Sequence, residues 1–461
     1  MTTEPGPAAG SPGPDKFNKV PHWIERRPRL RTRKRRRGRS PEQIRAQKRE
    51  KRRKPRRSGP STIVREADSD QPDKKKWQLR FGRGQLRTMP LPQVFSMLDD
   101  PESTILFLDD LVRHSSAESI RHISFDAEEC KNIGLDALVA MSVLVLRAER
   151  RRKDKNQLTI SGTWPNDLPI QIMFKASGIP HHLGLPEAKL TAEQEKLVHR
   201  CELYKGQAVK PRIALARQRN EATEHLRKYF DKCLNTVGFA LTRDGKSRLD
   251  KLISEVIGNA EEHGGPWNTI GHWQLGETGE GKRLGVCHIA MFNFGNSIYE
   301  SFLTEEASPT IVGQLRSLSD IHTKGGWFQL LKDTWDEETL WTLYAVQERV
   351  SRFSGLPGNE TRGNGTRDIV EFFLELGNPG TMCIVSGHAY ILFDGAYRFR
   401  EITRGDESLK IITFNKSNRL EDPPDRTYVR RLPRAFPGTM VSIRLTLDEH
   451  YLTRLAGDSN A

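Results

Sequence analysis

Residues 249–265 have the hydrophobic pattern of an amphipathic helix. Their apolar residues recur every three or four positions: Leu249, Leu252, Ile253, Val256, Ile257 and Ala260. This spacing puts them on one helix face. Glu255, Asn259 and His263 are four residues apart and share a second face. A carboxylate, an amide and an imidazole in one row, followed by two glycines, predict a ligand-facing helix; a solvated polar face is the alternative.

Residues 77–186 alternate between strand-like and helix-like patterns. The predicted strands are Thr104–Leu108, Ile120–Phe125 and Leu158–Gly162, and the predicted helices are Leu135–Glu149 and Pro169–Ser177. This alternation predicts a small α/β domain in which helices cover a sheet. A connector follows over residues 187–248, and we expect it to be mostly helical, because Thr191–Tyr204 and Leu215–Leu234 have helical spacing.

Residues 249–449 continue with strands and one further helix. After the opening helix, strands are predicted at Gly271–Leu275, Leu284–Phe294, Thr381–Ser386, Ala389–Phe393 and Pro437–Leu447. Gly363-Asn364-Gly365 begins an apolar helix, and the stretch before Pro437 looks irregular. The whole chain is therefore predicted to be an α/β (α+β) protein.

The positive charge is concentrated near the N-terminus. Arg26–Arg57 holds 19 Lys or Arg and 2 Asp or Glu, whereas the whole chain has 74 and 59 and a net charge of +15. The rest of the chain is therefore near neutral. Residues 1–76 have too few apolar side chains to offset the entropy of ordering, so we predict a disordered basic tail. Such a tail favours non-specific nucleic-acid contact through counterion release, and a merely solubilising charge run is the alternative.

Cysteine usage and hydropathy indicate the compartment. The five cysteines form no close pair in the sequence, and neither a disulfide framework nor a metal-ligand spacing is present. A reducing cytoplasm is the default for such a chain. No apolar run reaches the ~18 residues of a membrane span, and no secretory signal is recognisable. We therefore expect a cytoplasmic protein without a membrane segment.

The order of elements in residues 77–186 resembles the STAS domain of anti-sigma-factor antagonists. In that domain a strand ends in a short acidic loop, and a helix that opens with a Ser/Thr-Ser-Gly motif follows. This chain has Lys131, Asn132 and Ile133 before Gly134, so no hydroxyl stands where the phosphoacceptor would be. The resemblance implies a STAS-like fold that is not a phosphorylatable switch at that place.

Residues 249–449 resemble the GHKL (Bergerat-fold, histidine-kinase-like) ATP-binding domain. SEVIGNAEEHG is similar to the asparagine-bearing box of anti-sigma-type kinases, FNFGNSI to the first glycine box, TRGNGTRDI to the second, and PGTMVSIRL to the closing G-T strand. The four segments occur in the family's order. A short tail, residues 450–461, follows the domain.

This resemblance implies ATP and Mg²⁺ as ligands. Asn259 would supply an amide oxygen to the Mg²⁺ ion, which prefers such hard ligands. Glu255, one turn earlier, would be the candidate general base. Glycines at the start of a helix would expose N–H groups to phosphates. The implied nucleotide-binding residues are Asn259, His263, Asn293, Gly295, Ser297, Arg362, Gly363, Gly365 and Thr439, and Arg367 could neutralise phosphate charge.

Asn293 departs from the family, which usually has an aspartate that accepts a hydrogen bond from adenine. An asparagine can rotate its amide, so we expect weaker discrimination between ATP and GTP unless neighbouring groups fix the amide. Asn293→Asp should then raise the affinity for ATP. Loss of nucleotide binding with retention of the fold is the alternative.

The segment Tyr299–Asn359 corresponds to the family's ATP lid. Its aromatic residues Trp327, Phe328, Trp335 and Trp341 predict packing inside the lid, and a partner-binding surface is the alternative.

Four functional classes are compatible with these motifs. The first is an ATP-binding regulatory switch that acts on an unknown protein partner. The others are an anti-sigma-type Ser/Thr or histidine kinase, a DNA-associated GHKL ATPase that uses the basic tail, and a non-catalytic scaffold. A homodimer is compatible with each of them. The regulatory switch is our first expectation, because neither the residues before Gly134 nor His225, on a charged connector helix, has the sequence context of a phosphoacceptor, and no transducer-like domain follows the closing strand.

Overall fold

The computed structural model describes residues 24–26, 77–78, 85–152, 158–182, 190–206, 212–262, 266–277, 283–323, 335–348, 350, 365–376, 380–404 and 407–448. These residues form a mixed α/β structure and belong to one compact unit. The predicted C-terminal tail lies outside these residues. Of the predicted N-terminal tail, the structure describes only Ile24, Glu25 and Arg26. No helix in the described part of the chain is long and apolar enough to cross a bilayer.

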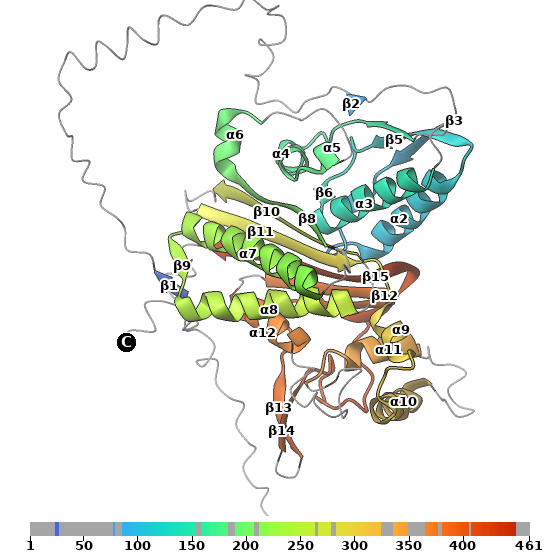
Figure 1. The fold of residues 1–461 in the computed structure, drawn as a ribbon, viewed down its shortest axis with the longest axis vertical. Helices are drawn as coiled ribbons and strands as arrows, with labels where there is room; N and C mark the ends of the chain where they lie inside the picture. The colour runs from blue at the N-terminus through green and yellow to red at the C-terminus, as the bar shows by residue number, and fades with distance from the viewer. Residues whose placement is uncertain are drawn as a thin grey trace, which may run out of the picture. The chain divides into compact units, whose positions relative to one another are not determined.

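A five-stranded sheet is the centre of the described residues (Figure 1). The strand order is β12 (Gly380–Phe393), β15 (Val429–Asp448), β11 (Arg283–Asn293), β10 (Trp267–Glu277) and β8 (Val198–Gly206), and every neighbouring pair is antiparallel. Side chains alternate between the two faces of each strand. The sheet therefore offers two apolar faces, and each face is covered by a different part of the chain.

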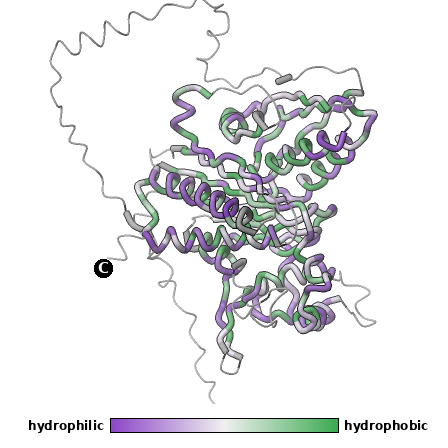
Figure 2. The backbone as a smooth tube through the Cα atoms, in the orientation of Figure 1, coloured by the Kyte–Doolittle hydropathy of each residue, from purple (hydrophilic) through white to green (hydrophobic). Residues whose placement is uncertain are grey.

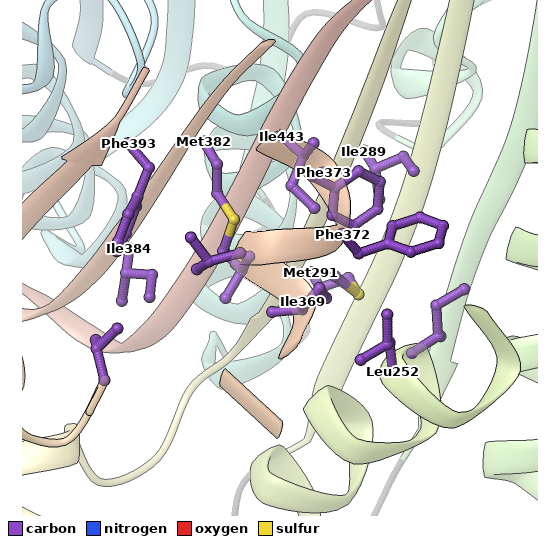
Figure 3. Close-up of a cluster of buried hydrophobic side chains, with 14 of the residues drawn as sticks. Leu252, Ile289, Met291, Ile369, Phe372, Phe373, Met382, Ile384, Phe393 and Ile443 are labelled. Atoms are coloured by element: carbon purple, nitrogen blue, oxygen red, sulfur yellow. The ribbon is translucent and has the colours of Figure 1, made fainter. Parts of the chain in front are cut away.

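The first face packs against α7 (Arg212–Thr236), α8 (Arg243–Glu262) and α12 (Gly365–Leu376). Figure 3 shows the centre of this layer, where Leu252 of α8 and Phe372 and Phe373 of α12 lie beside Met291 and Ile443 of the sheet. All five side chains are buried. Burial of one such side chain contributes roughly 1.5–3 kcal/mol, so the three helices are held firmly against the sheet.

The N-terminal lobe (residues 77–78, 85–152 and 158–182) has its own four-stranded sheet. The strand order is β2 (Trp77–Gln78), β7 (Thr159–Gly162), β5 (Ile120–Asp126) and β3 (Gln85–Pro90), and the pairs β3–β5 and β5–β7 are parallel. Its helices are α2 (Pro101–Ser116), α3 (Leu135–Arg151), α4 (Leu168–Ala176) and α5 (Ile179–His182), and a small parallel pair joins β4 (Val94–Phe95) to β6 (Asn132–Ile133). Figure 2 shows α3 as mainly hydrophobic, in agreement with its burial along most of its length.

The N-terminal lobe covers the second face of the five-stranded sheet. Buried side chains of the lobe and of the large sheet form one continuous apolar cluster. The members from the large sheet are Ile270, Ala290, Phe292, Cys383, Val385, Tyr390, Leu432, Phe436 and Met440, and Phe294, directly after β11, also belongs to the cluster. The lobe and the sheet therefore share a core.

Polar contacts fix the position of the lobe on the sheet. Arg444 of β15 donates two hydrogen bonds, of 2.6 and 2.7 Å, to the carboxylate of Asp99 in the turn before α2. Burial on its own would raise the pKa of Asp99, but the hydrogen bonds and the charge of Arg444, together with hydrogen bonds from Asn132 and Ser96, outweigh it and lower that pKa. The hydroxyl of Ser442 donates to Asp136 in the first turn of α3 over 2.7 Å, and Tyr390 donates to the carbonyl of Leu98. Because these hydrogen bonds are directional, they hold the lobe in one position along β15.

Thr104–Leu108, which we predicted as a strand, lies inside α2. The carboxylate of Asp100 accepts a hydrogen bond from the N–H of Ser103, and Pro101 occupies the first turn. An N-cap followed by proline is a strong helix start. The run TILFL has strand propensity, but its buried members recur at helical spacing together with Leu111. Capping and tertiary burial therefore outweigh local propensity here.

The prediction of a helix over Thr191–Tyr204 is also wrong in its second half. Thr191 and Gln194 form a capping box that starts α6, but the helix covers Ala192–Leu197 only. The chain then becomes β8, which pairs with β10 at the edge of the large sheet. The predicted helix Leu215–Leu234 is correct and lies within α7.

Five further strands differ from the prediction. β12 is one continuous strand rather than two, and its register shifts around Gly387. The irregular stretch contains a hairpin of β13 (Arg400–Arg404) and β14 (Glu407–Ile411), and β15 begins at Val429. Within the predicted tail, β1 (Ile24–Arg26) pairs with β9 (Phe239–Leu241). β12, β15 and β1 depend on pairing partners far away in the sequence, which local patterns do not encode.

Candidate functional site

Helix α8 presents the predicted polar row on its less buried side. Leu249, Leu252 and Ile257 are buried against the sheet, whereas Glu255 and Asn259 are half-buried. The 3.6-residue period therefore separates the two faces as the sequence predicted. His263, the third member of the row, lies outside the described residues.

Asn293 joins three segments that are distant in sequence. It is the last residue of β11, and its side chain is only 1% exposed. Its Oδ1 accepts a hydrogen bond of 2.8 Å from the N–H of Thr439 in β15. Its Nδ2 donates to the carbonyl of Ala260 in α8 over 3.4 Å. Helix α8, the end of β11 and the strand β15, which carry three of the segments that resemble family motifs, therefore meet at one side chain.

These two contacts fix the orientation of the Asn293 amide. A backbone N–H only donates and a backbone carbonyl only accepts, so a flipped amide would face two like partners. We expected this amide to rotate unless neighbouring groups fix it, and Thr439 and Ala260 do fix it. Our expectation that Asn293→Asp would raise the affinity for ATP also changes, because a carboxylate has no N–H to donate to Ala260.

We expect Asn293→Asp to lower the free energy of unfolding by about 1–3 kcal/mol, the cost of leaving a buried acceptor without its donor. Asn296→Asp is the matched control, because Asn296 is exposed and lies in the same loop. Urea unfolding followed by circular dichroism measures both variants. Equal midpoints for the two would mean that the amide group of Asn293 is not needed.

Gly438 lies directly against the loop that carries Asn293. A Cβ on Gly438 would stand 2.2 Å from the carbonyl oxygen of Asn293 and 2.9 Å from the nitrogen of Gly295, and its φ is +140°. Only glycine accepts this contact and this backbone conformation without strain. Gly438 therefore allows the backbone of β15 to lie close to the backbone of Asn293 and Gly295.

Hydroxyl groups continue the site from Thr439. The hydroxyls of Ser386 and Thr439 lie 2.8 Å apart, and the Ser386 oxygen also accepts a hydrogen bond from the N–H of Ile298. Ser297 caps α9 (Ile298–Phe302) through its hydroxyl, which accepts from the N–H of Glu300. Sequence reasoning missed Ser386. The signal was a hydroxyl residue directly after the apolar run Met382–Val385.

The second glycine box is described only from Gly365, the first residue of α12. Arg362 and Gly363 lie outside the described residues. Arg367, which we expected to neutralise phosphate, is instead surrounded by carboxylates. Its Nη1 lies 2.7 Å from Glu348, and its guanidinium also contacts Asp368 and Glu371. These carboxylates already balance its charge, so Arg367 is a structural residue in this arrangement.

The described part of the predicted lid is anchored to β12. It contains α10 (Pro309–Thr323) and α11 (Glu337–Tyr344), and Trp341 is fully buried, in agreement with lid core packing. Trp335 is also buried, whereas Trp327 and Phe328 lie outside the described residues. The carboxylate of Glu338 accepts hydrogen bonds from the backbone N–H and the Nδ1 of His388, beside the bulge at Gly387. The start of α11 is thereby held on the sheet.

The donor set on α8 fits a hard divalent cation. Asn259 offers an amide oxygen and Glu255 a carboxylate one helical turn away, and Mg²⁺ prefers such oxygen ligands together with water and phosphate. Within the described ranges, no three His, Cys, Asp or Glu side chains are grouped to hold a metal ion by themselves. An Mg²⁺ ion at Asn259 would therefore depend on oxygens from a bound nucleotide and water.

Comparisons with protein-family models, with curated proteins and with solved structures gave no match to this chain.

Proposed function

We propose that this protein binds ATP with Mg²⁺ and acts as a nucleotide-dependent regulatory switch on a protein partner. One observation carries the proposal: Asn293 hydrogen-bonds to α8 and to β15 at once. The segments that it joins are three of the four that resemble the boxes of GHKL ATPases. α12, which begins at the fourth, packs on α8 through the contact between Arg248 and the ring of Phe372.

Each group has a defined task in this proposal. Asn293, Gly295 and Thr439 form the base end of the site, where a flat ring can approach the backbone of Gly295 because that residue has no side chain. Asn259 holds the Mg²⁺ ion, which screens the phosphate charge. The N-terminus of α12 supplies N–H groups and the positive end of its dipole to the phosphates. Glu255 is the candidate general base if water attacks the terminal phosphate.

A nucleotide titration tests the proposal. Ligand at about 100 times its Kd stabilises the folded state by about 2.7 kcal/mol, so MgATP should raise the Tm clearly. Asn259→Ala should abolish the part of this shift that requires Mg²⁺. Lys251→Ala is the control, because Lys251 lies on the same helix and is exposed. Absence of any shift in the wild-type protein at millimolar MgATP would reject the proposal.

The same samples show whether bound ATP is hydrolysed, transferred to protein or only bound. Release of inorganic phosphate would indicate a hydrolysing switch, and a labelled protein band after incubation with γ-labelled ATP would indicate a kinase. Binding without either would indicate a switch that responds to nucleotide exchange. Glu255→Gln should abolish phosphate release while it keeps binding, if Glu255 is the general base.

A further inference from the structure

The base end of the proposed site and the N-terminal lobe lie on opposite faces of the same strand ends. On β11, Asn293 faces the site, whereas Phe292, one residue earlier, belongs to the core shared with the lobe. On β15, Thr439 contacts Asn293, and Met440, one residue later, belongs to the shared core. Because neighbouring residues of a strand point to opposite faces, the lobe packs directly behind the site.

Phe294 connects the two sides. It follows Asn293 and precedes Gly295, and its ring packs against the rings of Phe292 and Phe436 at centroid distances of 5.4 and 5.7 Å. The guanidinium carbon of Arg147 lies 4.6 Å from the centroid of the same ring. Arg147 belongs to α3, so this contact joins the central helix of the lobe to the first glycine box.

The opposite end of α3 is also attached to the large sheet. Asp136, in the first turn of α3, accepts the hydrogen bond from Ser442 of β15. Helix α3 is therefore held at its start by β15 and near its end by the loop after β11. A change in the position of α3 would move Phe294 and hence the backbone of Asn293 and Gly295.

We propose that Arg147 is a positioning residue for the nucleotide site and that the N-terminal lobe controls nucleotide affinity through it. This inference rests on the proposed function. The cation on the face of Phe294 attracts the ring electrostatically and selects one position of the loop. The lobe is then the regulatory part of the switch, and the coupling runs in both directions. Nucleotide binding must stabilise the docked position of α3 by the same free energy by which docked α3 favours nucleotide binding.

The test uses the full chain with three variants. Arg147→Met keeps most of the side-chain stem and removes the charge, and Arg147→Lys keeps a cation. Arg150→Met is the matched control, because Arg150 lies three positions later on α3 and is exposed. Isothermal titration with MgATP measures affinity. Hydrogen–deuterium exchange, with and without MgATP, measures the protection of residues 293–297 and of α3.

We expect Arg147→Met to weaken MgATP binding about threefold to tenfold, the range of a partly desolvated cation–π contact. Exchange at residues 293–297 should become faster, and nucleotide should no longer protect α3. Arg147→Lys should restore most of the affinity, and Arg150→Met should resemble wild type. If wild type binds MgATP and Arg147→Met binds it equally well with unchanged exchange, the inference is overturned and the proposed function stands. If wild type binds no nucleotide, the proposed function fails and the inference fails with it.

Discussion

A chain shortened to residues 187–461 should fail to fold. Removal of the N-terminal lobe would expose the sheet face that contains Ile270, Phe292, Val385 and Met440, all of which are buried in the shared core. At roughly 1.5–3 kcal/mol for each side chain, these four alone account for about 6–12 kcal/mol. This is comparable to the whole stability of a typical domain, about 5–15 kcal/mol. The exposed face would also be a large apolar patch and would promote aggregation.

Expression of the fragment beside the full chain tests this expectation. The full chain should unfold in one calorimetric transition, with equal calorimetric and van't Hoff enthalpies, because the lobe and the sheet share a core. The fragment should be insoluble or should melt without a cooperative transition. A monomeric fragment with a sharp transition near that of the full chain would show that the lobe is not needed for the fold.

Gly438→Ala should destroy the base end of the proposed nucleotide site. The new methyl group would lie 2.2 Å from the carbonyl oxygen of Asn293, and the φ of +140° is unfavourable for any residue with a Cβ. Backbone strain of this kind costs about 1–3 kcal/mol, and overpacking costs about 1–3 kcal/mol more. We therefore expect a loss of about 2–6 kcal/mol in the free energy of unfolding, together with loss of MgATP binding.

Gly313→Ala is the control for this substitution. Gly313 lies in α10, is exposed, and would give its Cβ open space, so alanine there should leave stability unchanged or raise it by up to about 1 kcal/mol. Chemical unfolding and a MgATP thermal shift measure both variants. A folded Gly438→Ala protein with wild-type stability would mean that the loop of Asn293 can move away from β15, contrary to the close approach described above.

The elements that sequence patterns predicted well are those whose signal is local. Helix α8 was predicted because its apolar residues follow the helical period over several turns. The strands β10 and β11 were predicted from the strand-like patterns of Gly271–Leu275 and Leu284–Phe294. The strand Thr104–Leu108 was predicted wrongly, because its apolar run received more weight than the N-cap at Asp100.

The parts that could not be predicted depend on distant contacts. β8 is a strand because β10 offers it an edge, and nothing within Val198–Gly206 requires that pairing. The amide orientation of Asn293 is set by Thr439 and Ala260, so it is known only once both partners are placed. Docking of the N-terminal lobe did leave one signal in the sequence. β11 and β12 are apolar at consecutive positions, which indicates that both faces of a strand are covered.

The place of β15 in the sheet has a consequence for protein synthesis. This strand lies between β12 and β11 and receives α2 of the N-terminal lobe, yet it follows all other described elements along the chain. During translation the lobe and the other four strands of the large sheet emerge from the ribosome before the strand that joins them. Their apolar faces stay uncovered until Val429–Asp448 has been made, and such pairing between distant segments forms slowly. The nascent chain, rather than the finished protein, is therefore the form that most needs protection by chaperones.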